Sequence, residues 1–431
     1  MTKRTLQLLL LSCISSVGAM GQINCSTSLK LVCQIPFSTG AFNTNGGVTP
    51  ESLVAAQGIA TAINSAIATQ ISQLPLASAS AGTVVLYRAG VPETYNNLGP
   101  ILTDRAQTIG RHRIFIGFTA SQFFFTDING IPLGNVPFTF EATAKDNNGN
   151  VVSNTFTSES TNIHFKVNQY IVVGTYGITD KIDVSMIVPI ERVSIGAATF
   201  NNQAYVLNAD NTALLVPPYS PAATYTPGTA SGLGDITFNG KYVVWRGEHA
   251  TFSGGMNFRT PTGDALNYLG SGAWGFNPYL VYSYLWKVSP HAKIGYQWNT
   301  ATELNNPTST PGGNQALPGG LQYDLGGDWA ATKHLTVAID LLGSQYLNST
   351  KLALSTVPLT FLPTPTSTTK TSVNLPTVVR ANSTYTINDL SAGVKWNPYR
   401  DLVLSGNVLF QLNNVGMRSR PTPLVGISYK F

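Results

Sequence analysis

The sequence predicts an all-β fold: a closed antiparallel transmembrane β-barrel of about twelve strands, or fourteen, preceded by a helical or irregular N-terminal segment. Three observations lead to this prediction. Long segments alternate between apolar and polar residues. Charged residues are scarce, although no stretch after the N-terminus is apolar enough for a membrane-spanning helix. Short and long connections between the predicted strands follow each other in turn.

The alternation is clearest in residues 232–245, which read GLGDITFNGKYVVW. One face carries Ile236, Phe238, Tyr242 and Val244, and the other carries Asp235, Thr237, Asn239 and Lys241. A period of two places successive side chains on opposite faces of a strand. The predicted strands run for about 10 to 14 residues, which is enough for a tilted strand to cross a bilayer while one face lines a wet lumen.

Composition supports the same class of protein. Charged residues make up 10% of the chain and hydrophobic residues 43%, whereas a soluble globular protein carries about 25% charged residues. No apolar run of about 18 residues follows the N-terminus, which excludes a helical membrane protein. The net charge of +5 comes without a basic run or patch, so nucleic acid is not an expected partner.

The first residues predict export. Residues 1–21 have the pattern of a cleaved signal peptide, with Lys3 and Arg4 before an apolar core and small residues at its end. Cys13 bears a weaker resemblance to a lipoprotein acceptor site. Cys25 and Cys33 remain after cleavage, and an even pair in an oxidising compartment predicts a disulfide. The expected location is the outer membrane of a Gram-negative-type envelope.

Residues 22–110 lack the barrel pattern and are expected to form a periplasmic or plug segment. An amphipathic helix is predicted over about residues 50–74, with Thr49 as N-cap and Pro50 in its first turn. Isoleucine recurs every fourth residue at Ile59, Ile63, Ile67 and Ile71. This apolar stripe fits a helix that packs on the barrel or pairs in the periplasm, and it equally fits a plug inside the lumen.

Residues 111–431 are predicted to form the barrel. Five tight turns, near residues 180–181, 246–249, 287–291, 333–334 and 397–400, alternate with six longer connections. The connections include 127–162, 201–231 and 351–382, which are expected to be loops. An even strand count with both ends on the short-turn side is the bacterial outer-membrane arrangement. Tyr429 and the terminal Phe431 are typical of the signal that the barrel-assembly machinery reads.

Inward-facing polar residues are the candidates for lining a pore. They are Asp235, Asn239, Lys241, Asn257, Arg259, Asp324, Asp328, Asp340, Asp389 and Lys395. Asp235 is expected almost opposite Arg259, where the ion pair would brace the wall or shape the field at a constriction. Asp324 is expected near Asp340, with Asp328 below it, so that water or a bound Ca²⁺ would have to separate the carboxylates. No metal site or cofactor is assigned.

Basic residues gather at the predicted turns or strand entries. This collar consists of Arg111, His112, Arg113, Arg246, His249, Lys287, His291, Lys333 and His334. It would either bind lipid phosphates and anionic solutes or serve as ordinary interfacial anchoring to outer-membrane lipid.

Several motifs resemble one family of proteins. They include GLGDITFNGKY, FRTPTGD, GFNPYLVYSY, SPHAKIGYQW and LQYDLGGDWAATKHLTVAIDLLG. These segments are similar to the outer-membrane family of phenol-degradation meta-pathway proteins, often called transporters, over roughly residues 95–431. The resemblance implies an outer-membrane barrel with a role in the passage of aromatic or other hydrophobic compounds, distantly like fatty-acid and toluene channels.

The expected function is therefore a channel for passive uptake of small hydrophobic or aromatic compounds. The alternatives are a nonspecific porin and a structural or adhesive surface barrel whose Thr- and Pro-rich loops do the work. An enzyme is not expected, because His164 is the one histidine near the outer end and no Ser and acid partner can be assigned to it.

Overall fold

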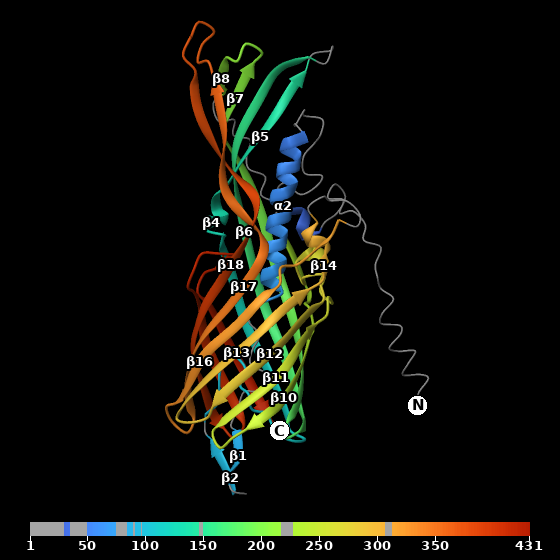
Figure 1. Ribbon diagram of the computed structural model, residues 1–431, viewed down its shortest axis with the longest axis vertical. Coiled ribbons are helices and arrows are strands. Elements are labelled where there is room, and N and C mark those ends of the chain that lie inside the picture. The colour runs from blue at the N-terminus through green and yellow to red at the C-terminus, as the bar shows by residue number, and fades with distance from the viewer. Residues whose placement is uncertain are drawn as a thin grey trace, which may run out of the picture.

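The computed structural model describes residues 30–34, 50–74, 84–88, 91–95, 97–145, 150–216, 227–306 and 313–431. In these ranges twelve antiparallel strands close into a ring, which confirms the predicted fold class, with twelve strands and not fourteen (Figure 1). In order around the ring they are β3 (Ile114–Ile128), β6 (Val151–Thr179), β7 (Ile182–Asn208), β10 (Thr237–Arg246), β11 (Ala250–Arg259), β12 (Gly275–Tyr284), β13 (Val288–Asn299), β16 (Gly320–Ala330), β17 (Leu335–Phe361), β18 (Thr371–Tyr399), β19 (Leu402–Gln411) and β21 (Thr422–Lys430). Pairing of β21 with β3 closes the ring.

The remaining elements are the long helix α2, the ten-residue strand β5 and shorter pieces. They are η1 (Leu31–Gln34), α2 (Pro50–Ile71), β1 (Val84–Arg88), β2 (Val91–Tyr95), β4 (Ile131–Pro132), η3 (Leu133–Asn135), β5 (Val136–Lys145), β8 (Ala213–Val216), β9 (Gly228–Leu233), η4 (Ala265–Asn267), β14 (Ala301–Thr302), η5 (Glu303–Asn305), β15 (Gln315–Ala316) and β20 (Met417–Ser419). Among the described residues, no helix has both the length and the apolarity needed to span a membrane.

The two ends of the barrel differ. Five short turns and the C-terminus lie at one end, called here the turn end, and the six longer connections lie at the other, the loop end (Figure 1). The β1–β2 hairpin hangs below the turn end. This matches the predicted alternation of short and long connections, and it follows from an even number of strands whose first and last members pair.

Apolar side chains cover the outside of the ring. In β10, Phe238 and Tyr242 are exposed, whereas Thr237, Asn239 and Lys241 are buried inside. Exposed tryptophans mark both rims: Trp245, Trp286, Trp329 and Trp396 near the turn end, and Trp274 and Trp298 near the loop end. An outward apolar band between two aromatic girdles is the surface of a barrel that faces lipid.

One side of the barrel continues well beyond the loop end. Strands β6 and β18 each have 29 residues, and β7 and β17 each have 27. The expectation that 127–162, 201–231 and 351–382 are loops is therefore wrong: these stretches supply β5, β8, and the outer parts of the four long strands. Their Thr- and Val-rich sequence favours strands. Strands outside the bilayer need no strict alternation of apolar and polar residues, so they lack the pattern by which the membrane strands were recognised.

The prolines in residues 351–382 favoured the assignment of this stretch as a loop. Pro358 and Pro376 both lie in the outer ribbon, where β17 beyond Tyr346 pairs only with β18 among the described strands. A proline is tolerated there because one edge of each strand makes no ladder hydrogen bonds.

Helix α2 lies along the inner face of this tall side and enters the ring with its C-terminal end (Figure 1). From Ala56 onward nearly all of its described side chains are buried, on every face of the helix. The isoleucines Ile59, Ile63 and Ile67 join an apolar cluster with wall residues such as Phe165 and Val378. The prediction of a one-sided stripe was too narrow, because a helix enclosed by a barrel buries its alanine faces as well.

The lipid-facing assignment can be tested with two exposed leucines. Leu280, on β12 between the aromatic girdles, should cost about 2–4 kcal/mol of folding free energy when replaced by arginine, because its side chain would lie in hydrocarbon. Leu354, exposed on the outer ribbon of β17, should tolerate the same replacement within about 0.5 kcal/mol. Urea unfolding of L280R and L354R in lipid vesicles measures both, and equal losses would contradict the assignment.

Candidate functional site in the barrel lumen

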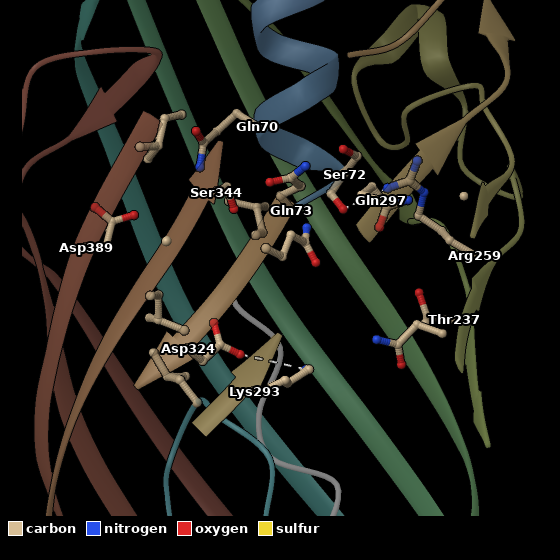
Figure 2. Close-up of a pocket in the computed structure, with 18 of the residues that line it drawn as sticks. Gln70, Ser72, Gln73, Thr237, Arg259, Lys293, Gln297, Asp324, Ser344 and Asp389 are labelled. Atoms are coloured by element: carbon tan, nitrogen blue, oxygen red, sulfur yellow. Dashed lines mark hydrogen bonds and ion pairs between the residues drawn. The ribbon is translucent and has the colours of Figure 1, made fainter. Parts of the chain in front are cut away.

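A cavity of about 210 Å³ lies in the lumen below α2 (Figure 2). Its roof is formed by Gln70, Ser72, Gln73 and Leu74, at and just after the end of the helix. Leu102 and Asp104 contribute its lower side, from a stretch of chain that crosses the lumen before β3. The N-terminal part of the chain therefore bounds the cavity from both directions along the barrel axis.

The wall of the cavity has two faces of different chemistry. Strands β10, β11, β13 and β16 supply a polar face of Thr237, Asn239, Asn257, Arg259, Lys293, Gln297, Gln322 and Asp324. Strands β7, β17, β18 and β19 supply Ile187, Leu342, Tyr346, Ile387 and Leu409, interrupted by Ser344 and Asp389. The cavity is thus amphipathic across the barrel diameter.

Arg259 links the polar face to the helix. Its Nη1 donates to the backbone carbonyl of Ser72 at 2.8 Å, and its Nη2 donates to Asn299 Oδ1 at 2.9 Å. Asp235 lies 3.7 Å from its Nε, so the expected pair is present. Asp235 is itself held by the backbone N–H and hydroxyl of Ser271. The guanidinium thus neutralises a buried carboxylate and caps a carbonyl that follows the end of α2.

Lys293 is a lumen residue that is missing from the predicted pore-lining set. Its Nζ lies 2.9 Å from Asp104 and 3.8 Å from Asp324 (Figure 2 shows the second contact). The period of two, followed back along β13 from the inward-facing Gln297, would have placed it inside.

His291 does not belong to the predicted basic collar. It is buried in the lumen, with Nδ1 3.3 Å from Asp328 and Nε2 2.9 Å from Asp340. The chain turns at residues 285–287, and β13 begins at Val288, so His291 lies within the strand instead of in the turn. Gly326, opposite Asp340, lacks the side chain that would occupy the space of this contact.

The same cluster revises the expected arrangement of carboxylates. Asp340 pairs in register with Gly326, which places it between Asp324 and Asp328 along the neighbouring strand. The cations beside these carboxylates are His291 and Lys293 of the protein itself, where the prediction had water or Ca²⁺. Within the described ranges, no three His, Cys, Asp or Glu side chains gather as a metal-binding group.

Residues 97–110, called here the floor segment, cross the lumen near the turn end. Lys241 Nζ donates to the carbonyls of Arg105 and Gln107 at 3.0 and 2.9 Å, and Lys395 donates to the carbonyls of Leu98 and Pro100. These two lysines were predicted to line the pore; they do face the lumen, where they hold a backbone segment. No periodic pattern in the floor segment marked it for this position.

Further strands grip the floor segment. Asp183 on β7 accepts from the N–H of Ile109, Ser283 on β12 from that of Ala106, and Thr336 on β17 from that of Leu98, all within 2.9–3.0 Å. Thr103 Oγ1 lies 2.7 Å from His291 Nε2. The segment is therefore fixed by hydrogen bonds and charges around the circumference of the barrel.

The other predicted residues have simpler positions. Asp389 pairs with Arg418 at 2.6 Å, and Asn239 donates to Asn257 at 2.7 Å, both inside the ring. The remaining collar residues lie at the turn end: Arg111, His112, Arg246, Lys287, Lys333 and His334 are exposed, and Arg113 and His249 are partly exposed.

The termini bear on the remaining sequence predictions. The rings of Tyr429 and Phe431 lie 4.7 Å apart, and Phe431 is exposed. Cys33 is disulfide-bonded, whereas Cys25 and the predicted signal peptide, residues 1–21, lie outside the described residues, so those predictions stay predictions.

Removing the His291 side chain should destabilise the folded barrel. In H291A, Asp328 and Asp340 would remain buried without the cation between them, a loss of about 3–5 kcal/mol of folding free energy. H334A, which truncates an exposed turn histidine, should change stability by less than about 0.5 kcal/mol. Unfolding in urea by tryptophan fluorescence compares the two variants, and a mild effect of H291A would show that the cluster does not anchor the floor.

Comparisons with known proteins found one family model and several solved structures that this chain resembles. The model of the family described as "Putative MetA-pathway of phenol degradation" matches residues 142–351. A crystal structure of an outer membrane channel from Pseudomonas putida F1 is 14% identical, with 76% of this chain and 98% of that chain covered and a TM-score of 0.44. The toluene transporter TbuX from Ralstonia pickettii is 11% identical, with 75% of this chain and 90% of that chain covered and a TM-score of 0.25.

A FadL homologue from Pseudomonas aeruginosa is 11% identical, with 74% of this chain and 88% of that chain covered and a TM-score of 0.27. No curated protein matches the sequence. The resemblance read from the sequence is confirmed over residues 142–351: there the chain carries the pattern of the phenol-degradation family, on a closed twelve-stranded barrel.

Proposed function

We propose that this protein is an outer-membrane channel for passive uptake of small hydrophobic or aromatic compounds. The observation that carries the proposal is an internal cavity, partly apolar, within a closed ring whose outer surface suits lipid. The family described by a role in phenol degradation supports the class of solute. In this proposal the loop end faces outward and the turn end faces the periplasm, as in other outer-membrane barrels.

The test is transport by the purified full chain in liposomes. A hydrophobe channel should take up labelled toluene faster than protein-free liposomes while giving little or no ionic conductance in planar bilayers. A nonspecific porin would show large, stable openings. Toluene entry no faster than in protein-free liposomes, together with silent bilayers, would contradict the proposal.

A structural or adhesive surface protein is the second candidate. The observation in its favour is the tall side of the barrel, where β6, β7, β17 and β18 carry the sheet beyond the loop end together with β5 and β8 (Figure 1). Such a protein would show neither uptake nor conductance, so the same experiment separates the two functions.

Within the predicted periplasmic or plug segment, 22–110, helix α2 and the floor segment would act as a plug made of two unlike parts. The floor segment is held by charged and polar groups from many strands. Helix α2 rests mainly on apolar contacts, with a few polar ones such as Tyr268 to Asn64, and Arg259 holds Ser72 just after its end. Apolar contacts have no fixed geometry, so α2 is the part better suited to move, and solute reaching the cavity from the loop end must pass it.

A disulfide can test whether α2 has to move. A Cβ placed on Gly58 of α2 would lie 3.7 Å from the Cβ of Arg380 on β18, which is the separation that a disulfide needs. Oxidised G58C/R380C should therefore lose most of its toluene uptake, because the helix is tied to the wall, and a reductant should restore it.

The single variants G58C and R380C and the wild type, each with and without reductant, control for the cysteines themselves and for reduction of the native disulfide at Cys33. Uptake at the wild-type rate by the oxidised double variant would show that the solute does not pass α2.

A further inference from the structure

The chemistry of the cavity specifies its ligand more closely than hydrophobicity does. We infer that the cavity is a binding site for a neutral molecule of one ring that carries an oxygen able to accept a hydrogen bond, in preference to a plain hydrocarbon. This inference rests on the proposed channel function, since the ligand would be a solute held on its way through the lumen.

Size limits the ligand first. The cavity measures about 210 Å³, and an apolar protein cavity of about 150 Å³ is known to accept benzene. The volume here therefore suits a single ring with one small substituent. The apolar face, with Leu342, Ile387 and Leu409, offers the surface against which such a ring would pack.

Two amides on the polar face provide hydrogen-bond donors. Asn257 Oδ1 accepts from Asn239 at 2.7 Å, and Gln322 Oε1 accepts from Asn277 at 2.6 Å. These bonds fix the oxygen end of each amide. Among the residues that the structure describes, neither side-chain NH₂ group donates to a protein atom. A ligand oxygen can accept from them, whereas a hydrocarbon would displace water and leave them unpaired.

Charge excludes the anionic form of such a ligand. Arg259 is paired with Asp235, and Asp389 is paired with Arg418. Lys293 faces two carboxylates, Asp104 and Asp324. The cations at the cavity are thus already matched by carboxylates, with one carboxylate in excess, so an added carboxylate would meet repulsion instead of a free cation.

Three ligands of nearly equal size test the inference: 4-fluorobenzyl alcohol, 4-fluorotoluene and 4-fluorobenzoate. Their binding to the purified full chain in detergent micelles can be followed by fluorine NMR titration. The alcohol should bind about threefold to tenfold more tightly than the toluene, the gain expected from a hydrogen bond made inside a protein. The benzoate should bind most weakly.

Asn257→Leu is the sharpest variant, because it keeps the shape while removing the NH₂ group, and Asn239 retains its second bond to Tyr279. It should weaken binding of the alcohol about threefold to tenfold and leave the affinity for the toluene within about twofold of wild type. The retained toluene binding also shows that the barrel is folded. Gln322→Met should act in the same way. Asn407→Leu, an inward-facing amide outside this cavity, is the matched control and should change neither affinity.

The inference would be overturned if the toluene bound as tightly as the alcohol or if the benzoate bound best. It would also be overturned if N257L and Q322M left the affinity for the alcohol unchanged. These outcomes are independent of transport. Selective binding without uptake into liposomes would contradict the channel and leave the site intact, whereas uptake without selectivity would contradict the site alone.

Discussion

The need to satisfy every backbone hydrogen bond in a medium without water governs this structure. A sheet in hydrocarbon cannot leave an edge open, so it must close on itself. Here the last strand closes onto the first: Leu424 to Lys430 pair with Ser121 to Phe115, and the terminal Phe431 exchanges backbone hydrogen bonds with Ile114. The outward apolar face, the even strand count and the position of both barrel ends at the turn end follow from this closure.

Closure also creates an interior that has to be filled. Polar side chains that point away from lipid converge in the lumen, and buried charges are costly unless they are paired. The protein meets this requirement with its own N-terminal chain. Lys241 and Lys395 donate hydrogen bonds to carbonyls of the floor segment. Lys293 pairs with Asp104, and His291 contacts both Asp328 and Asp340. The floor segment thus supplies partners that the buried charges of the barrel wall need.

The upper lumen is filled in a different way. Inward-facing aromatic and aliphatic residues of the tall side pack around α2, whose isoleucines and alanines supply no charges. The cavity lies where these two kinds of filling meet, and this explains its two faces: amides and ions on one side, leucines and isoleucine on the other. A solute that enters there would exchange water for contacts of both kinds, so the site can discriminate by polarity as well as size.

The sequence alone determined which side of strands such as β10 faces lipid, the approximate positions of the five tight turns and a count of about twelve strands, because each depends on spacing between near neighbours. It gave the right face for Asp235 and Arg259. It misplaced His291, since turn residues beside a strand look alike until the register is known, and it treated the outer strands as loops.

Only the tertiary structure decided what occupies the lumen. The contacts that place the floor segment join residues 136 and 295 positions apart in the chain, as in Lys241 to Arg105 and Lys395 to Pro100. No local pattern carries such information, because a short polar segment has the same sequence character in water as inside a barrel that supplies its partners.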